Sequence, residues 1–177
     1  MTHEHDYEQA GVFRRMVRRT AATRPMAWIY ARIQQRIDSS VFRLTRGRTT
    51  VSSWVSGLQL VMLTTTGAKT GRRRTLPVLG LVEGEEIVVI ASNYGRRSNP
   101  AWYHNLRAHP RASVTVDGAT RDVEALELTG EERERHFQRG VEVYPGFLHY
   151  RRWAANRQIP VIRLDSAPRA AQPGATD

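Results

Sequence analysis

The sequence predicts an α+β fold that is mainly β: a small barrel of antiparallel strands with helices at its periphery. The centre of the chain contains about six short runs of β-branched and other apolar residues, separated by short turn-forming links. One of these links is Asp117-Gly118, a dipeptide typical of two-residue hairpins. Helical periodicity does not follow each run, so the pattern argues against βαβ units and favours a barrel.

The N-terminal residues 1–48 are predicted to form a basic helical arm. Apolar residues recur at helical spacing over Val12–Arg19 and Met26–Leu44. Residues 11–48 contain ten arginines and one acidic residue, so this stretch carries +9 of a total net charge of +10. Three uses of the arm stay open, in this order: packing on the barrel or on a second subunit, contact with an anionic membrane surface, and binding of nucleic acid.

Residues 49–165 are expected to form the barrel itself, entered through a turn-rich connection that contains Trp54. Asn99 and Pro100 suit the N-cap and the first position of a short helix. The elements predicted for this half are strands at Leu58–Thr65, Thr75–Val82 and Ile87–Ser92, followed by that helix at Ala101–Arg107.

The second half of the barrel is expected to begin with the Asp117-Gly118 hairpin. Thr129 can then cap a helix that runs to about Val143, and Tyr144-Pro145-Gly146 ends it. The elements predicted here are strands at Ala112–Val116 and Ala119–Leu128, a helix at Phe147–Arg157, a last strand at Ile159–Leu164 and an irregular tail at residues 166–177.

Composition narrows the class of protein. The length of 177 residues and the 40% apolar content suit one domain with its own core. Cysteine is absent, which excludes disulfides, thiolate metal sites and cysteine nucleophiles. No apolar run approaches the roughly 20 residues of a membrane span, and no signal peptide is evident. We therefore expect a cytoplasmic protein, with peripheral contact to the inner face of the cell membrane as a possibility for the arm.

The stretch Leu60–Pro77 carries the first candidate site. An apolar run leads into a loop with two glycines and four cations, Lys69, Arg72, Arg73 and Arg74, and a second apolar run follows. Lys69 is the only lysine in the chain. Backbone N–H groups and fixed cations on a loop are suited to an anion such as a phosphate or a carboxylate.

A second polar loop, Asn93–Asn99, follows another apolar run. If both loops lie on the same side of the barrel, their cations and amides adjoin the rings of Tyr94, Trp102 and Tyr103, a combination that suits a long anion with a flat ring at one end. The alternative is that the arginines are solvated and Trp102 packs in the core. We favour solvated surface charge for Arg72 and Arg73, and binding for Lys69, Arg74 and Asn105.

Common catalytic motifs are weak. Ser92 lacks a recognisable histidine and acid, neither glycine pattern is a P-loop or a dinucleotide fingerprint, and His3 with His5 is not a metal site on spacing alone. No metal site is predicted.

Several separated motifs, in order, closely resemble the deazaflavin-dependent nitroreductase family, also described as F420H(2)-dependent quinone reductases. The resemblance covers about Leu58 to Leu164. Its motifs are Leu63–Gly71 with Arg74 and Pro77, then Val89–Asn93, Asn99–Leu106, His109-Pro110, Tyr144-Pro145-Gly146 and Ile159–Ile162.

This resemblance implies a split β-barrel related to FMN-binding oxidoreductases and a bound coenzyme F420, with FMN less expected. By the same likeness, Lys69, Thr70 and Arg74 hold the phosphate and acidic tail of the coenzyme. The residues implied to lie along the coenzyme or to frame its ring are Pro77, Ser92, Asn93, Tyr94, Gly95, Trp102 and Asn105.

The resemblance also implies an activity, hydride transfer from F420H2 to a small-molecule electrophile. Tyr144 and Tyr150 match catalytic tyrosines of the substrate pocket, and Trp54, Leu79 and Phe147 are further candidates for contact with the substrate. Phe147 stands where the nitroreductase pattern has another tyrosine, so we expect quinone or enone reduction before nitroimidazole reduction.

Other functions stay open at this point. The chain could be an F420-binding carrier with little turnover or an FMN-dependent oxidoreductase, and a nucleic-acid partner is not expected. A monomer and a homodimer are both compatible with the sequence.

Overall fold

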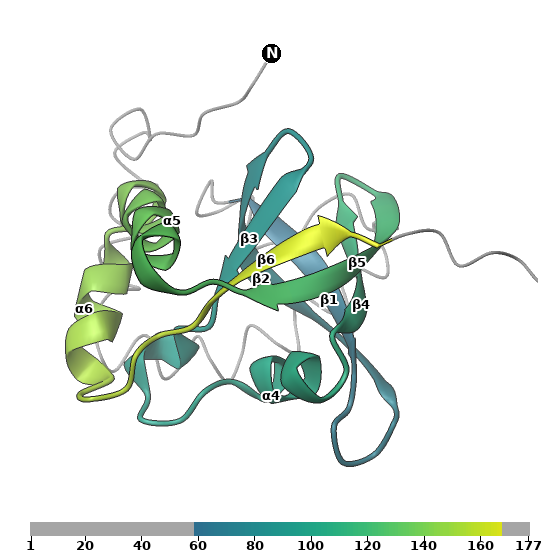
Figure 1. Ribbon diagram of the computed structural model, residues 1–177, viewed down its shortest axis with the longest axis horizontal. Coiled ribbons are helices and arrows are strands. Elements are labelled where there is room, and N and C mark those ends of the chain that lie inside the picture. The colour runs from purple at the N-terminus through teal and green to yellow at the C-terminus, as the bar shows by residue number, and fades with distance from the viewer. Residues whose placement is uncertain (1–58, 168–177) are drawn as a thin grey trace, which may run out of the picture.

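A computed structural model of the protein describes residues 59–167 (Figure 1). The predicted basic arm, Trp54 and residues 168–177 lie outside the described residues. Between residues 59 and 167, no helix is long and apolar enough to cross a membrane.

Six antiparallel strands form a closed barrel in the order β1-β2-β3-β6-β5-β4, so the predicted barrel is confirmed. It consists of two meanders, β1–β2–β3 and β4–β5–β6, joined by the β3–β6 and β1–β4 pairs. Closure gives each of these six strands a hydrogen-bonded neighbour on both sides. The strands are β1 Leu60–Thr66, β2 Arg73–Glu83, β3 Glu86–Ile90, β4 Arg111–Val116, β5 Ala119–Glu127 and β6 Val161–Ser166.

The helices of the described region lie in only two connections. The β3–β4 connection contains the short 3₁₀-helix η2 (Asn93–Gly95) and α4 (Ala101–Ala108), and the β5–β6 connection contains α5 (Gly130–Val143) and α6 (Gly146–Trp153). Figure 1 shows α4 at one end of the barrel, where the β1–β2 loop also projects, and α5 with α6 together beside the barrel.

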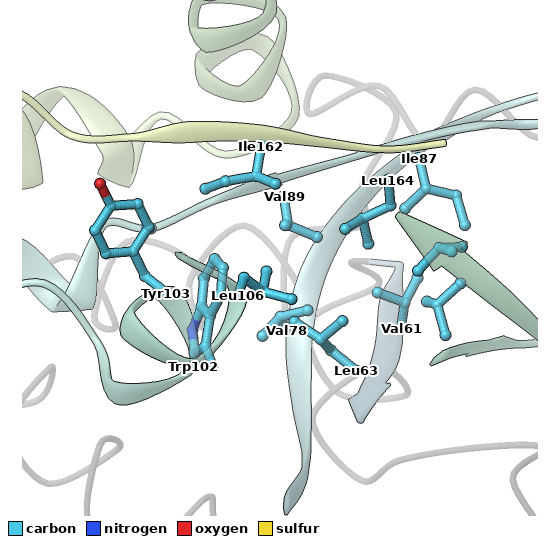
Figure 2. Close-up of a cluster of buried hydrophobic side chains, with 13 residues drawn as sticks. Val61, Leu63, Val78, Ile87, Val89, Trp102, Tyr103, Leu106, Ile162 and Leu164 are labelled. Atoms are coloured by element: carbon cyan, nitrogen blue, oxygen red, sulfur yellow. The ribbon is translucent and has the colours of Figure 1, made fainter. Parts of the chain in front are cut away.

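Two apolar clusters hold these layers together. The first fills the barrel, and α4 contributes Trp102, Tyr103 and Leu106 to it, so this helix closes one end of the interior (Figure 2). The second lies between the outer surface of the barrel and the pair α5 and α6. Its buried members are Leu81, Val88, Ile90, Leu128, Phe137, Tyr144, Phe147, Tyr150, Ala154, Ile159 and Val161.

The Asp117-Gly118 hairpin is confirmed, and its two central residues have φ of 48° and 84°, as a type I′ turn requires. The predicted N-cap at Asn99 is wrong. Pro100 occupies the cap position with an extended backbone, since its ψ is 154°, and α4 begins at Ala101. Asn99 instead accepts a hydrogen bond from Arg157.

The helix predicted at Phe147–Arg157 is too long at its C-terminal end. The observed helix, α6, begins at Gly146 and ends at Trp153, because Ala155 has a φ of 55° and the chain turns there toward β6. Thr129 does occupy the N-cap of α5, but its hydroxyl makes no capping hydrogen bond. The positions of both helices in the sequence are otherwise as predicted.

Candidate functional site

Residues 67–72 form the loop of the β1–β2 hairpin. The Gly67 N–H donates to the Arg72 carbonyl over 2.9 Å, and the Gly71 N–H donates to the Gly67 carbonyl over 2.8 Å. Gly71 has a φ of 64°, a conformation that a side chain would strain. The loop is therefore closed on itself by its own backbone.

Asn105 on α4 fixes this loop to the end of the barrel. Its Oδ1 accepts the Ala68 N–H over 3.0 Å, and its Nδ2 donates to the Thr65 hydroxyl over 3.0 Å. Thr65 is only 1% exposed. Both ends of the Asn105 amide are thus engaged in positioning the loop, and a direct contact of Asn105 with a coenzyme stays a prediction.

The loop carries positive charge that no acidic group within residues 59–167 offsets. Lys69, Arg72 and Arg74 are exposed, and within residues 59–167 their side chains form no ion pair or hydrogen bond. The carboxylates that form ion pairs in this region belong to the β2–β3 hairpin, α5 and β6. The loop is therefore a suitable place for an anion to bind.

Arg73 differs from its neighbours. It pairs with Thr66, whereas Arg74 pairs with Thr65, so the two arginines face opposite sides of β2. Arg73 Nη2 donates to the Ser113 hydroxyl over 2.9 Å. Arg73 is exposed, as expected for a surface charge, and in addition its side chain extends past β1 to bind β4.

The second loop begins earlier than predicted, because β3 ends at Ile90 and not at Ser92, so it spans Ala91–Asn99. Its backbone is unusual. Asn93, Tyr94 and Gly95 have φ of 48°, 56° and 71°, three consecutive left-handed residues. For the two that are not glycine this costs on the order of 1 kcal/mol each or more, and such conformations concentrate at functional sites. Asn93 Nδ2 stabilises the loop by donating to the Ser98 carbonyl over 2.8 Å.

Gly95 seats this loop against α6. A Cβ atom at Gly95 would lie 2.8 Å from Trp153 Cβ and 3.0 Å from both the Cα and the carbonyl oxygen of Tyr150. Only glycine fits this approach without a shift of the backbone. The loop and the helix that carries Tyr150 are consequently in direct contact.

Sequence reasoning missed Arg157, which lies between α6 and β6. Its guanidinium donates to the carbonyls of Ala91, Ser92 and Arg96 and to the side-chain oxygen of Asn99. Burial lowers its pKa. A single arginine before a strand gave no signal of this role, because its partners are mostly backbone carbonyls.

Tyr144 and Tyr150, the predicted catalytic residues, form a buried pair of phenols. Their hydroxyl oxygens are 3.0 Å apart, and the residues are 7% and 4% exposed. Burial raises the pKa of Tyr150, and the neighbouring Tyr144 adds to the increase. The Tyr94 ring of the second loop lies 6.0 Å from the Tyr150 ring.

The predicted substrate residues within the described region join the same cluster. The Phe147 ring is 5.5 Å from Tyr144 and 6.1 Å from Tyr150, and Phe147 is 3% exposed. Leu79 packs against this cluster while partly exposed. The cluster therefore combines two phenols with apolar walls beside the second loop.

Two residues predicted along the coenzyme have other surroundings. Trp102 is 7% exposed inside the barrel (Figure 2), which corresponds to the core-packing alternative. Pro77 alternates with the interior residue Val78 and is on the same outer side of β2 as Leu79. Thr70 is exposed in the first loop, and Ser92 is half-buried in the second.

The model of one family, F420H(2)-dependent quinone reductase, matches residues 34–165. The chain belongs to the F420H(2)-dependent quinone reductase family. It is accordingly an F420H2-dependent oxidoreductase, and its cofactor is coenzyme F420. The resemblance found in the sequence is confirmed at this level.

Relatives in Mycobacterium tuberculosis are named for the same activity. Rv3178 is 33% identical over 96 residues, 54% of this chain and 80% of the relative. Rv1261c is 34% identical over 82 residues, 46% of this chain and 54% of the relative, so that match spans about half the length of Rv1261c.

Two solved structures share the fold. An F420-H2 dependent reductase, FDR-A, is 37% identical with a TM-score of 0.56, and the match covers 60% of this chain and 94% of that one. A chain described as a domain-swapped dimer is 32% identical with a TM-score of 0.59, and the match covers 80% and 99%. The split-barrel fold class is confirmed.

The residues present fit coenzyme F420. Its phospholactyl-glutamate tail is a chain of anions, and the first loop offers cations that have no acidic partner among the described residues. Its flat deazaflavin ring needs apolar and aromatic surroundings with a few polar groups, and the second loop offers Tyr94 together with Ser92 and Asn93.

Proposed function

We propose that the protein reduces a quinone or an enone with F420H2, with the coenzyme tail on the first loop and its ring beside the second. The observation that carries this proposal is the exposed positive charge of Lys69, Arg72 and Arg74, which form no ion pair within the described part of the chain, on a loop fixed to α4 through Asn105. Lys69, Thr70 and Arg74 bind the acidic tail, and Ser92, Asn93, Tyr94 and Gly95 (with Pro77 nearby on β2) orient the ring.

When bound, the reduced coenzyme supplies a hydride, that is, two electrons and one hydrogen. A quinone becomes a hydroquinone when it takes up that hydride and one proton. The protein's part is to hold the coenzyme and the acceptor at the distance and orientation that hydride transfer requires. In well-oriented cases this lowers the activation free energy by about 7 to 11 kcal/mol.

The Tyr144 and Tyr150 phenols, whose oxygens are 3.0 Å apart, are the groups that we propose to act on the acceptor's oxygen. The raised pKa keeps Tyr150 protonated, so it serves as a hydrogen-bond donor rather than as a base. Water supplies the proton to the reduced acceptor, directly or through Tyr144. Phe147 provides no hydroxyl between these two tyrosines, which favours quinones and enones over nitro compounds.

Steady-state oxidation of F420H2, followed by its absorbance, tests this proposal with menadione, a cyclic enone and a nitroimidazole as acceptors. We expect turnover with the first two and little with the third. Tight F420 binding without turnover on any acceptor would indicate a carrier. Faster turnover of the nitroimidazole would contradict the substrate class.

Contact of the basic residues 11–48 with a membrane stays a prediction. Co-sedimentation of the full chain with anionic vesicles, lost at high salt and absent with zwitterionic vesicles, would support it. The oligomeric state is open between monomer and homodimer, and light scattering during gel filtration distinguishes them.

A further inference from the structure

We propose that Arg157 is the positioning residue that sets the conformation of the second loop, Ala91–Asn99, and thereby the affinity of the protein for the ring end of its coenzyme. The second half of this inference rests on the proposed function, whereas the first half does not. Arg157 itself lies outside the loop, between α6 and β6.

The contacts of Arg157 are distributed along the whole loop. At its start, Nη1 donates to the Ala91 carbonyl over 3.3 Å and Nη2 to the Ser92 carbonyl over 2.8 Å. In its middle, Nε and Nη2 donate to the Arg96 carbonyl over 3.1 and 3.0 Å. At its end, Nη1 donates to Asn99 Oδ1. One side chain thus joins both ends and the middle of the loop.

Other hydrogen bonds of this loop each join only two positions: the Ala91 N–H donates to Pro160, the Ser92 N–H to Ile90 and the Asn93 side chain to the Ser98 carbonyl. The loop belongs to no strand, and its three left-handed residues are held internally by two backbone hydrogen bonds, from Gly95 to Ser92 and from Arg96 to Asn93. The carbonyls of Ala91 and Ser92 that Arg157 binds are partly buried, and a buried carbonyl needs a donor, whereas the bonds to the Arg96 carbonyl are exposed. Arg157 thus supplies donors to residues on both sides of the left-handed segment.

The geometry requires arginine and not merely a cation. The acceptors of Arg157 among residues 59–167 are all neutral oxygens, and none is a carboxylate. A guanidinium presents five N–H groups in a planar fork, whereas an ammonium presents three from one atom and cannot reach acceptors so far apart. Lysine at this position would keep the positive charge but could not bind the start, the middle and the end of the loop at the same time.

Arg133 on α5 provides a matched control. Arg133 is buried where Arg157 is half-buried, and its Nε and Nη2 donate to a backbone carbonyl, that of Ile159, over 3.2 and 2.8 Å, while its Nη1 pairs with Glu134 over 2.9 Å. It has no hydrogen bond to the second loop. A merely structural role for Arg157 would make Arg157→Lys and Arg133→Lys behave alike.

Hydrogen exchange of the coenzyme-free protein, read by mass spectrometry, tests the first half of the inference. In Arg157→Lys we expect the amides of Gly95 and Arg96 to exchange about tenfold faster or more, while those of residues 67–72 are unchanged. Arg133→Lys should leave both segments as in the wild type. Unchanged exchange at Gly95 and Arg96 in Arg157→Lys would overturn the inference.

Fluorescence titration tests the second half with two probes, F420 and the deazaflavin ring without its phospholactyl-glutamate tail. Arg157→Lys should weaken both about tenfold, and Lys69→Ala should weaken only F420. Unchanged affinities in Arg157→Lys, with normal binding by the wild type, would overturn this inference alone. Absence of F420 binding by the wild type would instead overturn the proposed function.

A second variant covers the case in which Arg157→Lys does not fold. Asn99→Ala removes one acceptor and leaves the three carbonyls in place. We expect the same changes in exchange and in affinity for both probes, at a few-fold rather than tenfold size. Wild-type behaviour of Asn99→Ala in both measurements would then overturn the inference.

Discussion

Two single residues, Asn105 and Arg157, each hold one loop of the candidate site in place through hydrogen bonds to the protein itself. Asn105 binds the first loop through Ala68, and Arg157 binds the second through three backbone carbonyls. Sequence reasoning identified Asn105 as a ligand because an amide beside cations suggests binding. It could not identify Arg157, since bonds to backbone carbonyls leave no pattern of residue types.

Gly95 allows a test of how tightly the second loop is seated. Gly95→Ala adds a Cβ at positive φ that would also meet Trp153 and Tyr150, whereas Gly71→Ala adds one at positive φ with no atom within 4 Å. We expect Gly71→Ala to cost about 1 kcal/mol and Gly95→Ala about 2 to 4 kcal/mol. Melting temperatures should fall by about 3 °C and about 6 to 12 °C. Equal losses would show that Gly95 is not closely packed.

The raised pKa of Tyr150 predicts that the stability of the protein falls at alkaline pH. The Tyr150 pKa is raised in the folded state, so its contribution is complete below the unfolded tyrosine pKa of about 10 and is lost as the pH rises above that value. The rings of Tyr94 and Tyr144 contact the ring of Tyr150, and besides burial both neighbours contribute to its raised pKa.

We therefore expect the melting temperature to fall above about pH 10, and to fall less steeply in Tyr150→Phe. Tyr103, whose pKa burial also raises, remains in this variant and maintains part of the slope. At pH 7 the variant should lose about 1 kcal/mol, the value of one hydrogen bond. An identical alkaline slope in both proteins would contradict the burial of the Tyr150 hydroxyl.

Among the secondary-structure elements, α4 connects the two parts of the site. It follows the second loop directly, and Asn105 in its middle fixes the first loop. Its apolar side, Trp102 with Tyr103 and Leu106, packs into the end of the barrel. A displacement of α4 would thus move both loops together.

This connection predicts the effect of Asn105→Ala on coenzyme binding. The substitution frees the first loop from α4, so F420 affinity should fall about five- to tenfold even though the cations remain. Thr65→Val, which removes only the bond to Asn105 Nδ2, should have a smaller effect. Titration with F420 measures both variants, and wild-type affinity in Asn105→Ala would show that the loop needs no anchor.

The strands and helices of the described region could largely be predicted from the sequence. Alternating apolar residues and Asp117-Gly118 define the hairpins locally, and the helices begin near Thr129 and Pro100. The errors are at ends, as at Asn99, where a hydrogen bond from distant Arg157 replaces the expected cap. A contact between residues so far apart in the sequence has no local signal.

At the scale of residues 59–167, two meanders close into one barrel, and the β1–β2 loop and two helical connections supply the candidate site. The β3–β4 connection supplies the second loop and α4, and the β5–β6 connection supplies the tyrosine pair and Arg157. The sequence predicted a barrel but not which strands close it, because the β1–β4 and β3–β6 pairs join segments far apart in the chain.

Parallel titration of the purified protein with F420, FMN and NADPH tests the central claim most directly. We predict selective binding of F420, weakened about tenfold or more by Lys69→Ala and by Arg74→Ala, because each removes a charge-assisted contact worth roughly 1.5 to 3 kcal/mol. Arg73→Ala, whose side chain binds Ser113, serves as the control and should change the affinity less. Binding of FMN in preference to F420, or F420 affinity unchanged in both variants, would contradict the account.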